Sequence, residues 1–327
     1  MNSFGRIFRI SIYGESHGKG VGVVVDGIPP GIKIEANDFA ADLDRRKGGK
    51  TGTTERIESD IPEFISGIFN LRTTGTPLNI FFPNKNVRPG DYENIRDIPR
   101  PGHADFTALK KFGGFNDHRG GGHFSGRLTV GLVAAGIVAK KILSGMNFKA
   151  DVVEIGGEKD IKKGLEKISG TGDSTGGIVE CRINGIPVGL GEPFFDSAES
   201  LLSHLVFSIP GIKGIEFGSG FRSASMRGSE HNDKLIDKNG KTSTNNDGGI
   251  NGGITNGNEL VFRVAVKPAS SIFLKQKTVN ISTGNIEELK LEGRHDSCVA
   301  LRVPVILEAA AAIVLTDLHL LRQKQVP

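Results

Sequence analysis

The sequence has no tryptophan and only two tyrosines among its 327 residues. Proteins that bind single-stranded nucleic acid commonly stack the bases on aromatic side chains. The shortage therefore argues against a nucleic-acid groove, and it also argues against a stacking platform for sugars. The formal net charge of +4 is too small to indicate nucleic-acid binding by itself. We expect no nucleic-acid partner.

Cysteine is scarce too, because Cys181 and Cys298 are the only two and stand far apart in the chain. Their spacing predicts neither a disulfide framework nor a metal site, and a reducing compartment is the default for such a protein. Long apolar runs are missing as well. The first ten residues contain none of the length that a signal peptide needs, and no segment approaches 18 uncharged apolar residues. We expect a cytoplasmic protein with no membrane span and no bound metal.

Glycine, in contrast, is abundant, with 46 residues or about twice its usual share. The glycines follow no collagen-like period, which indicates many turns and close approaches of the backbone. Residues 239–258 are rich in Gly, Asn and Thr and have the composition of a linker. Their paired glycines suit a backbone cradle better, and no internal repeat is evident. We therefore predict a single domain over residues 1–327.

Hydrophobic periodicity predicts strands and helices in mixed order. The expected strands are 4–12, 20–25, 64–69, 78–82 and 260–267, with a strand–turn–strand unit over 173–188. The expected helices are 37–46 with Asn37 as N-cap, 128–143, 198–207 and 304–322. Residues 84–115 are expected to be an irregular cover over a functional site. Strand and helix do not alternate strictly, so we predict an α+β fold with antiparallel sheets.

Basic residues cluster after the first expected helix: Arg45, Arg46, Lys47, Lys50 and Arg56 fall within twelve positions. A charge run of this kind is usually a solvated loop. Alternatively, its guanidinium groups bind the oxygen atoms of an anionic small molecule. The charges alone leave both interpretations open.

Three histidines stand in glycine-bounded segments that fit no helical or strand period: His17 in residues 14–18, His103 in 101–105 and His295 in 293–298. Glycine lets the backbone approach a ligand closely, and functional side chains are concentrated on loops. Three such loops from distant parts of the chain predict one site that they build together.

The first of these segments reads Gly-Glu-Ser-His-Gly. Its His17 either exchanges protons with a reacting group or is a structural histidine bonded to the backbone. The segment also has the Gly-x-Ser-x-Gly spacing of a hydrolase nucleophile elbow, with Ser16 at its centre. An elbow needs a following helix, and the next expected strand begins by Gly20, so the hydrolase interpretation is weak.

The other segments carry further candidates. His103 has Asp105 near enough in sequence to orient its imidazole. Residues 120–122 are three glycines before the expected buried helix, which predicts an anion or cofactor site at its N-terminus unless they form a hinge. Asp296 follows Arg294 closely and would be kept ionised by it, although Arg–Asp neighbours more commonly form surface ion pairs.

Taken together, the segments resemble the chorismate synthase family in order and spacing over nearly the whole chain. The matching segments are residues 8–9, 14–18, 25–31, 42–46, 73–77, 100–105, 188–193, 208–214, 226–229, 248–254, 267–268 and 293–298. The resemblance implies a β-α-β sandwich fold and a homotetramer. It also implies a lyase of the shikimate pathway, which converts 5-enolpyruvylshikimate 3-phosphate to chorismate by 1,4-anti elimination of phosphate and a ring proton. Such enzymes need reduced FMN, and NADPH serves some of them as the reductant.

The resemblance also implies roles for individual residues. His17 and His103 match two general acids, one for the departing phosphate and one for the reduced flavin. Asp296, with Ser16, matches the relay that keeps the flavin ready to take the ring proton. Arg45, Arg46 and Arg127 match substrate- or nucleotide-binding positions. The flavin-contact positions are matched by His123, Phe124, Ser125, Pro210, Gly211, Gly252, Lys267, Pro268, Ala269, Ser270, Ser271 and Arg294.

The chain departs from the family pattern before the buried helix. The family usually has Gly-Arg-Ser-Ser-Ala-Arg-Glu-Thr where residues 122–129 read Gly-His-Phe-Ser-Gly-Arg-Leu-Thr. His123 thus replaces an arginine, and it would restore the charge when protonated, so binding is expected to tighten at lower pH. The basic loop is also about one residue shorter, so Lys50 or Arg56 would replace another arginine. This altered position is the one argument for a non-catalytic flavoprotein that kept the fold.

Overall fold

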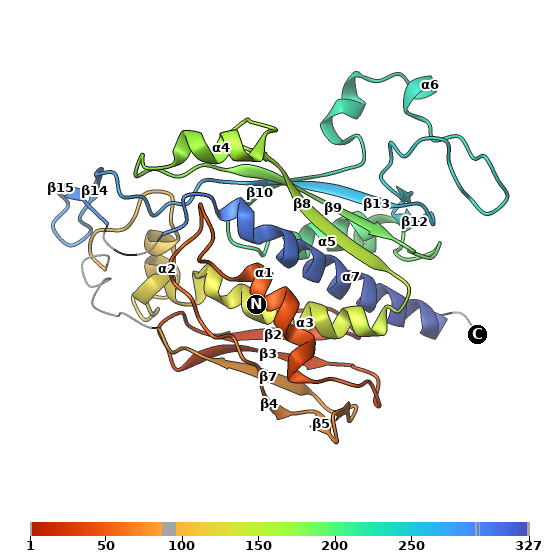
Figure 1. The fold of residues 1–327 in the computed structure, drawn as a ribbon, viewed down its shortest axis with the longest axis horizontal. Helices are drawn as coiled ribbons and strands as arrows, with labels where there is room; N and C mark the ends of the chain where they lie inside the picture. The colour runs from red at the N-terminus through yellow and green to blue at the C-terminus, as the bar shows by residue number, and fades with distance from the viewer. Residues whose placement is uncertain (1, 87–95, 292, 294, 326–327) are drawn as a thin grey trace.

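Two antiparallel β-sheets enclose a layer of helices, as Figure 1 shows with one sheet below and one above. The computed structural model describes residues 2–86, 96–291, 293 and 295–325. Within these residues the layers share one main hydrophobic core. The predicted antiparallel β-α-β sandwich is confirmed, and it forms a single domain.

The first sheet packs one face against the helices. Its strands run in the order β1 (Ser3–Phe4), β2 (Arg9–Gly14), β3 (Gly20–Asp26), β7 (Leu78–Pro83) and β4 (Glu63–Ser66). Alternate residues of β7 are buried, as expected for a strand with one face toward the core. The predicted strand 4–12 is interrupted at residues 5–8. There the carboxylate of Asp317 accepts backbone N–H groups of Arg6, Ile7 and Phe8.

The second sheet covers the other side of the helices. Its strands run in the order β10 (Ile212–Phe217), β13 (Leu260–Val266), β9 (Gly177–Asn184) and β8 (Asn147–Ile155). The predicted strand 260–267 is confirmed. The predicted strand–turn–strand unit over 173–188 is wrong, because only β9 forms there and its two neighbours in the sheet are β8 and β13. Strand β8 lies in a region for which no strand was predicted.

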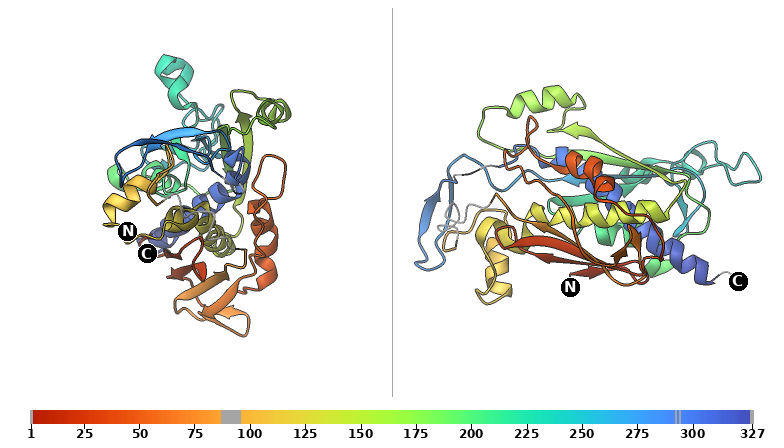
Figure 2. Two further views of the ribbon diagram at one scale, coloured as in Figure 1. Left: turned by 90° about the vertical axis from the view of Figure 1, so that its left-hand side faces the viewer. Right: turned by 60° about the horizontal axis from the view of Figure 1, so that its bottom comes forward.

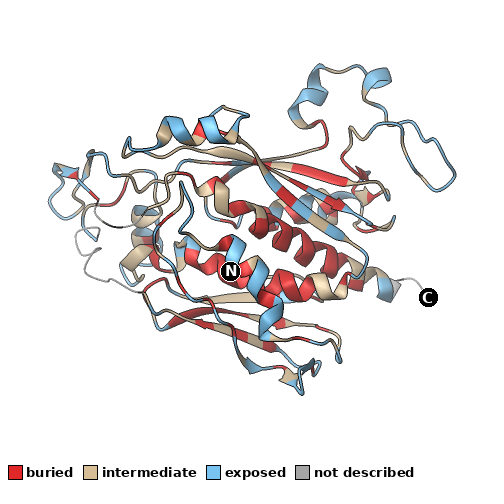
Figure 3. Ribbon diagram, viewed as in Figure 1, coloured by how far each residue is buried: buried red, intermediate tan, exposed pale blue. Residues whose placement is uncertain are grey.

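The helical layer consists of α1 (Ala40–Arg46), α3 (Thr129–Ile142), α5 (Ala198–Val206) and α7 (Val303–Gln325). Helices α3 and α7 are buried along most of their length, as Figure 3 shows in red. They approach so closely that a Cβ on Gly136 would lie 2.3 Å from the Cβ of Ala309. The four predicted helices are all present, with small shifts at their ends.

One helical stretch, Val299–Lys324, is long and apolar enough to cross a membrane by length and composition. In its most apolar window, however, 78% of the residues are buried inside the protein. The apolar residues of α7 are therefore accounted for by packing between the two sheets, as in the core helix of a soluble protein.

Two local predictions about helices were wrong, one about an N-cap and one about a segment expected to be irregular. The cap of the first helical segment, the 3-10 turn Ala36–Phe39 that leads into α1, is not Asn37. Its N-cap is Glu35, whose backbone N–H donates to the carboxylate of Asp38 at 2.7 Å. The segment 84–115, predicted to be irregular, contains helix α2 (Asp105–Lys111) in its described part.

The remaining elements lie at the periphery, as the two views of Figure 2 show. Helix α4 (Ile161–Ile168) lies over the second sheet, and the short helix α6 (Gly228–His231) belongs to an arm that projects from the body (Figure 1). Three two-stranded hairpins complete the chain: β5 (Ile68–Phe69) with β6 (Arg72–Thr73), β11 (Ile250–Asn251) with β12 (Ile254–Thr255), and β14 (Gln276–Val279) with β15 (Ile286–Leu289).

Candidate functional site

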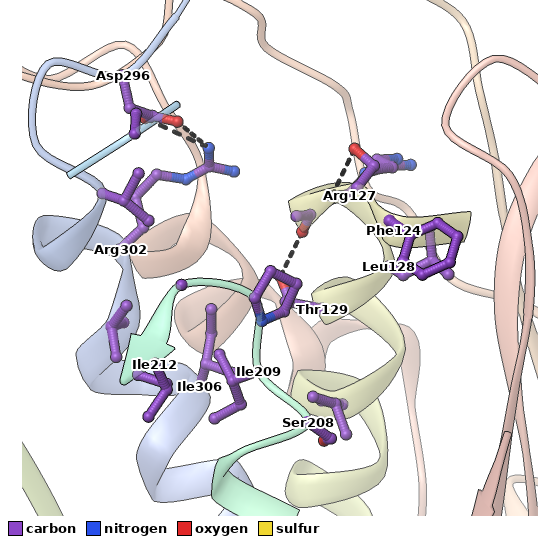
Figure 4. A pocket seen from close by; sticks show the side chains of 18 of the residues that line it. Phe124, Arg127, Leu128, Thr129, Ser208, Ile209, Ile212, Asp296, Arg302 and Ile306 are labelled. Carbon is purple, nitrogen blue, oxygen red and sulfur yellow. Dashed lines mark hydrogen bonds and ion pairs between the residues drawn. The ribbon is translucent and has the colours of Figure 1, made fainter. Parts of the chain in front are cut away.

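A cavity of about 790 Å³ lies where the segment before α3, the loop after α5 and the start of α7 meet (Figure 4). Apolar side chains form one wall, among them Leu132, Ile209, Ile212, Val303 and Ile306. The rest of the lining is polar and carries charges from six separate parts of the chain. An apolar pocket with convergent polar groups is the usual form of a small-molecule site.

The polar wall is strongly cationic. Among the described residues that line the cavity are two carboxylates, Glu58 and Asp296, and eight basic side chains: Arg46, Lys47, Arg56, Arg100, Arg127, Lys213, Lys267 and Arg302. Such an excess of positive charge favours a ligand with several negative charges. Of the two interpretations of the basic cluster 45–56, the structure thus favours the anion-binding one for Arg46 and Arg56.

Arg46 and Arg127 reach the cavity from opposite sides of one buried carboxylate. Asp60 Oδ2 accepts from Arg46 Nη2 at 2.5 Å, and Asp60 Oδ1 accepts from Arg127 Nη1. Burial acts to raise the pKa of Asp60, but the two guanidinium charges hold it below its ordinary value. Burial also lowers the pKa of Arg46 to about 10, so that it remains a cation at neutral pH.

Asp296 lines the cavity on the opposite side, facing Arg302 of the turn that precedes α7 (Figure 4). Its two oxygens accept from Arg302 Nη1 at 3.4 and 3.1 Å, and its Oδ1 also accepts from the backbone N–H of Thr54 at 2.9 Å. Arg302 donates in turn to the backbone carbonyl of Arg46 at 3.0 Å. This carboxylate therefore ties the 293–298 segment to the basic loop.

His103 is held in place by the ion pair between Arg100 and Asp105. Asp105 Oδ1 lies 2.6 Å from His103 Nδ1, and Arg100 grips the same carboxylate through Nε at 2.7 Å and Nη2 at 2.8 Å. Burial acts to raise the pKa of Asp105, but hydrogen bonds from Arg100 and His103 hold it far below the usual range. Asp105 can only accept a hydrogen bond from Nδ1, whereas Arg100 Nη2, 3.0 Å from the same nitrogen, can only donate one, so the tautomer decides which contact is made. With the Nδ1 proton directed to Asp105, Nε2 is the nitrogen left to exchange a proton.

Ser16 and His17 lie directly behind the cavity wall. Ser16 is fully buried, and Arg56 donates to its Oγ at 2.9 Å and to its backbone carbonyl at 3.1 Å. The ring of His17 packs against Gly120, where an added Cβ would lie 2.3 Å from it. Arg56 and Gly120 are the residues that line the cavity in front of them. Ser16 also stands in a β2–β3 turn with no following helix, so the hydrolase elbow is absent.

His123, Phe124 and Ser125 line the cavity along the turn before α3. Glycines 120–122 have positive φ and form a tight coil, so the glycines precede a further turn rather than the N-terminus of α3 itself. His123 Nδ1 donates to the carbonyl of Gly14 at 2.9 Å, and its Nε2 lies 3.2 Å from Asn2 Oδ1. His123 thus bridges two segments at the edge of the cavity.

The segment Lys267 to Ser271 lines the cavity together with Pro210 and Gly211. Lys267 Nζ donates to the carbonyl of Gly102 at 2.6 Å and lies 3.0 Å from Ser270 Oγ. Burial and the nearby charge of Lys213 lower the pKa of Lys267. These contacts join the loop of His103 to the end of strand β13.

Among the described candidate residues, Arg45 and Gly252 lie away from this cavity, in addition to Ser16 and His17 behind its wall. Arg45 points elsewhere and pairs with Glu308 through two hydrogen bonds of 2.8 and 2.7 Å. Gly252 lies in the β11–β12 hairpin and is not among the residues that line the cavity. Arg294 lies outside the described residues.

Several lining residues had no assigned role in the sequence. Arg56 had been considered as a replacement for a family arginine, and Arg100 and Lys213 belong to matching segments. These three residues could have been found by considering every basic residue in the matching segments and in the basic loop. Arg302 and His204 gave no such signal in the sequence. Arg302 stands just before the apolar helix α7 and His204 stands within α5, and both resemble ordinary solvated positions.

Comparisons with known proteins agree with this architecture. The family model described as chorismate synthase matches residues 8–320. The chain belongs to the chorismate synthase family. Members of this family are lyases of the shikimate pathway, and the chain is accordingly a lyase.

Individual relatives cover nearly the full length. A chorismate synthase from Chitinophaga pinensis is 60% identical over 325 residues, which are 99% of this chain and 98% of that protein. One from Thermococcus gammatolerans is 45% identical, covering 98% of both. A crystal structure of chorismate synthase superposes with a TM-score of 0.74 at 26% identity, over 98% of this chain and 93% of the other.

Proposed function

We propose that this chain converts 5-enolpyruvylshikimate 3-phosphate to chorismate and phosphate by 1,4-anti elimination with reduced FMN. The observation that carries the proposal is the single cavity in which His103, Asp296 and a large excess of cationic side chains converge. The substrate has one phosphate and two carboxylates. Arginine binds such groups through paired N–H donors, which accounts for the composition of the polar wall.

Loss of phosphate leaves negative charge on the departing oxygens. Arg46 and Arg127 offset this charge, because both guanidinium groups are buried at the cavity. His103 acts as a general acid through Nε2, and the ionised Asp105 at its Nδ1 stabilises the protonated ring. His17 is the second proton donor and acts from behind Gly120, while Asp296 and Ser16 relay protons.

The cavity residues fit FMN. The apolar wall suits a flat ring system, and the cationic rim and the polar Lys267–Ser271 segment suit its phosphate and its polar edge. His123, Phe124, Ser125, Pro210 and Gly211 would hold it, with Gly252 and Arg294 as further expected contacts. When bound, reduced FMN would supply electron density to the reacting ring and take up the proton that the ring loses. The chain's own residues orient the substrate and exclude water.

The flavin is expected to be reduced elsewhere. No Gly-x-Gly-x-x-Gly fingerprint follows a strand in the sequence, so no dinucleotide-binding motif supports reduction by NADPH on this chain. NADPH remains the alternative reductant, with the basic loop at Arg45 and Arg46 as its expected contact. We place the enzyme in the cytoplasm, where the scarcity of cysteine is ordinary.

A homotetramer is the assembly that we propose. Large apolar side chains are exposed on the surface, including Phe194, Phe195, Phe221 and Leu235, which are between 70% and 92% exposed. Phe221 stands in the 3-10 turn Gly220–Ser225 before α6, and Leu235 lies after α6 in a bridge with Thr242. Phe194 and Phe195 lie side by side, with ring centroids 6.4 Å apart, and contiguous exposed apolar groups are typical of surfaces that bind another protein.

The test is anaerobic formation of chorismate from 5-enolpyruvylshikimate 3-phosphate. One reaction contains dithionite-reduced FMN, and the other contains oxidised FMN with NADPH. We expect turnover in the first and none in the second. Turnover in both would mean that the chain reduces its own flavin. Binding of FMN without turnover in either would contradict the proposal and favour a non-catalytic flavoprotein.

A further inference from the structure

We infer that Asp60 is a positioning residue that fixes Arg46 and Arg127 as one receptor for an oxyanion of the substrate. The inference rests on the proposed function for the identity of that substrate. Asp60 itself does not line the cavity, whereas both arginines do. Its effect on binding would therefore pass through them.

The geometry joins three parts of the chain at one buried carboxylate. Arg46 ends helix α1, Arg127 belongs to the turn before α3, and Asp60 stands in the loop before strand β4. Each Asp60 oxygen accepts from a different arginine. The Asp60 side chain is fully buried, and those of Arg46 and Arg127 are only 3% and 4% exposed. A third contact, from Arg127 Nε to Asn84 Oδ1 at 3.0 Å, restricts that guanidinium further.

Several N–H groups of these two arginines have no hydrogen-bond partner in the part of the chain that the structure describes, which indicates that a ligand binds there. Arg46 Nε and Nη1 and Arg127 Nη2 are buried and have no hydrogen-bond partner among the described residues. Leaving donors of a charged group unpaired in a buried position is unfavourable. An oxyanion bound between the two guanidinium groups would accept from these nitrogens. Asp60 occupies one side of each arginine and so leaves these donors for the ligand.

Charge balance explains why a carboxylate stands here. Two buried guanidinium groups repel each other, and Arg302 adds a third positive charge near Arg46. Asp60 offsets this repulsion and leaves the arginine pair with one net positive charge. Its backbone has a φ of 50°, in the left-handed region that aspartate tolerates better than most residues. The loop is thus folded so that the carboxylate meets both arginines.

The first variant to test is Asp60→Asn, with inorganic phosphate as the probe. Binding of phosphate to the full-length protein is measured by isothermal titration, and KM and kcat are measured with 5-enolpyruvylshikimate 3-phosphate. We expect the Kd for phosphate and the KM to rise tenfold or more, about 1.4 kcal/mol per tenfold, with a smaller fall in kcat. Unchanged or tighter phosphate binding would overturn the inference.

The matched control is Glu180→Gln on the outer face of the second sheet. Glu180 also bridges two arginines, accepting from Arg182 Nε and from Arg263 Nε at 2.7 Å each. It does not line the cavity, so this variant should bind phosphate and turn over substrate like the unmodified chain. An equal loss in both variants would show a general effect of breaking arginine bridges and would contradict a special role for Asp60.

Two further variants separate positioning from folding. In a chain that carries Arg127→Met, adding Asp60→Asn should weaken phosphate binding less than it does in the unmodified chain, because only its effect through Arg46 remains. If Asp60→Asn does not fold, Asp60→Glu keeps the charge but displaces the carboxylate. We expect it to fold and to bind phosphate several-fold more weakly, and unchanged binding would refute the inference. Because phosphate binding needs no turnover, an inactive protein that shows these effects would contradict only the proposed function.

Discussion

Individual carboxylates in this protein are kept ionised by the arginines beside them. Asp105 is the clearest example, since Arg100 donates to both of its carboxylate oxygens and His103 Nδ1 lies within hydrogen-bond distance of one of them. Its pKa lies below the ordinary aspartate value in the folded chain. A lowered pKa in the folded state means that the group stabilises the protein above its unfolded pKa, and that this contribution is lost as the pH falls through the folded value.

Asp105→Asn should therefore have a pH-dependent effect on stability. At pH 7 we expect the free energy of unfolding to fall by about 1–3 kcal/mol, because a buried charged hydrogen-bond acceptor is lost. Below pH about 4, the ordinary value for aspartate, the unmodified chain begins to lose this contribution, and the loss continues toward the much lower folded value. The two proteins should then become more alike. Urea unfolding at pH 7 and at pH 3 checks this, and a constant difference at both values would contradict it.

Sequence motifs predicted the residues that line the cavity better than the helical periodicity did. His103 and Asp296 reach one cavity from two of the three glycine-bounded segments, whereas His17 lies behind its wall. Arg127 and Lys267 line the same cavity at positions that the family resemblance implied. Arg302 was missed because it stands at the start of an apolar helix. Its role depends on the fold that brings Asp296 to within 3.1 Å, and no sequence period encodes that contact.

At the scale of elements, the close contact of α3 with α7 sets the separation of the layers. Gly136 allows this approach, because a Cβ there would lie 2.3 Å from Ala309 Cβ and 2.4 Å from its Cα. Glycine normally weakens a helix interior by about 1 kcal/mol relative to alanine. Its presence in the middle of α3 is explained by packing rather than by helix propensity.

Gly136→Val should destabilise the protein through overpacking. We expect the free energy of unfolding to fall by about 1–3 kcal/mol or more, since neither helix can move away between two sheets. Gly228→Ala, in the exposed helix α6 with the nearest atom 4.0 Å away, should change it by no more than about 0.5 kcal/mol. Thermal or chemical unfolding of both variants measures the difference. Equal stability of the two would show that α3 and α7 can separate at little cost.

Helices and strands with one buried face were predicted correctly. The predictions failed where the pairing of strands in the sheet decides the structure. Strand β7 and helix α5 show the expected alternation of buried and exposed residues. Residues 185–188 follow a clear turn, yet they leave the sheet because β8 already occupies that edge of β9. Helix α2 lies in a segment that proline and glycine made resemble a loop, and Ala108 is its one buried residue.

Over the whole molecule, positive charge is concentrated in the cavity. The described lining residues carry an excess of six positive charges when histidine is counted as neutral, whereas the chain as a whole carries +4. The rest of the protein is therefore slightly acidic. Composition alone could not reveal this separation, because the mild net charge conceals it. A polyanion should be guided to the cavity by this field.

The field should make substrate capture sensitive to salt. We expect KM for 5-enolpyruvylshikimate 3-phosphate to rise roughly tenfold between about 0.05 M and 0.5 M salt, since the Debye length falls to only a few ångströms. The rate constant kcat should change less than about twofold, because interactions in the closed cavity are screened little. Lys213→Gln removes an exposed charge at the rim and should flatten the dependence of KM on salt. A KM that does not respond to salt would mean that binding depends on the buried arginines alone, with no contribution from the wider field.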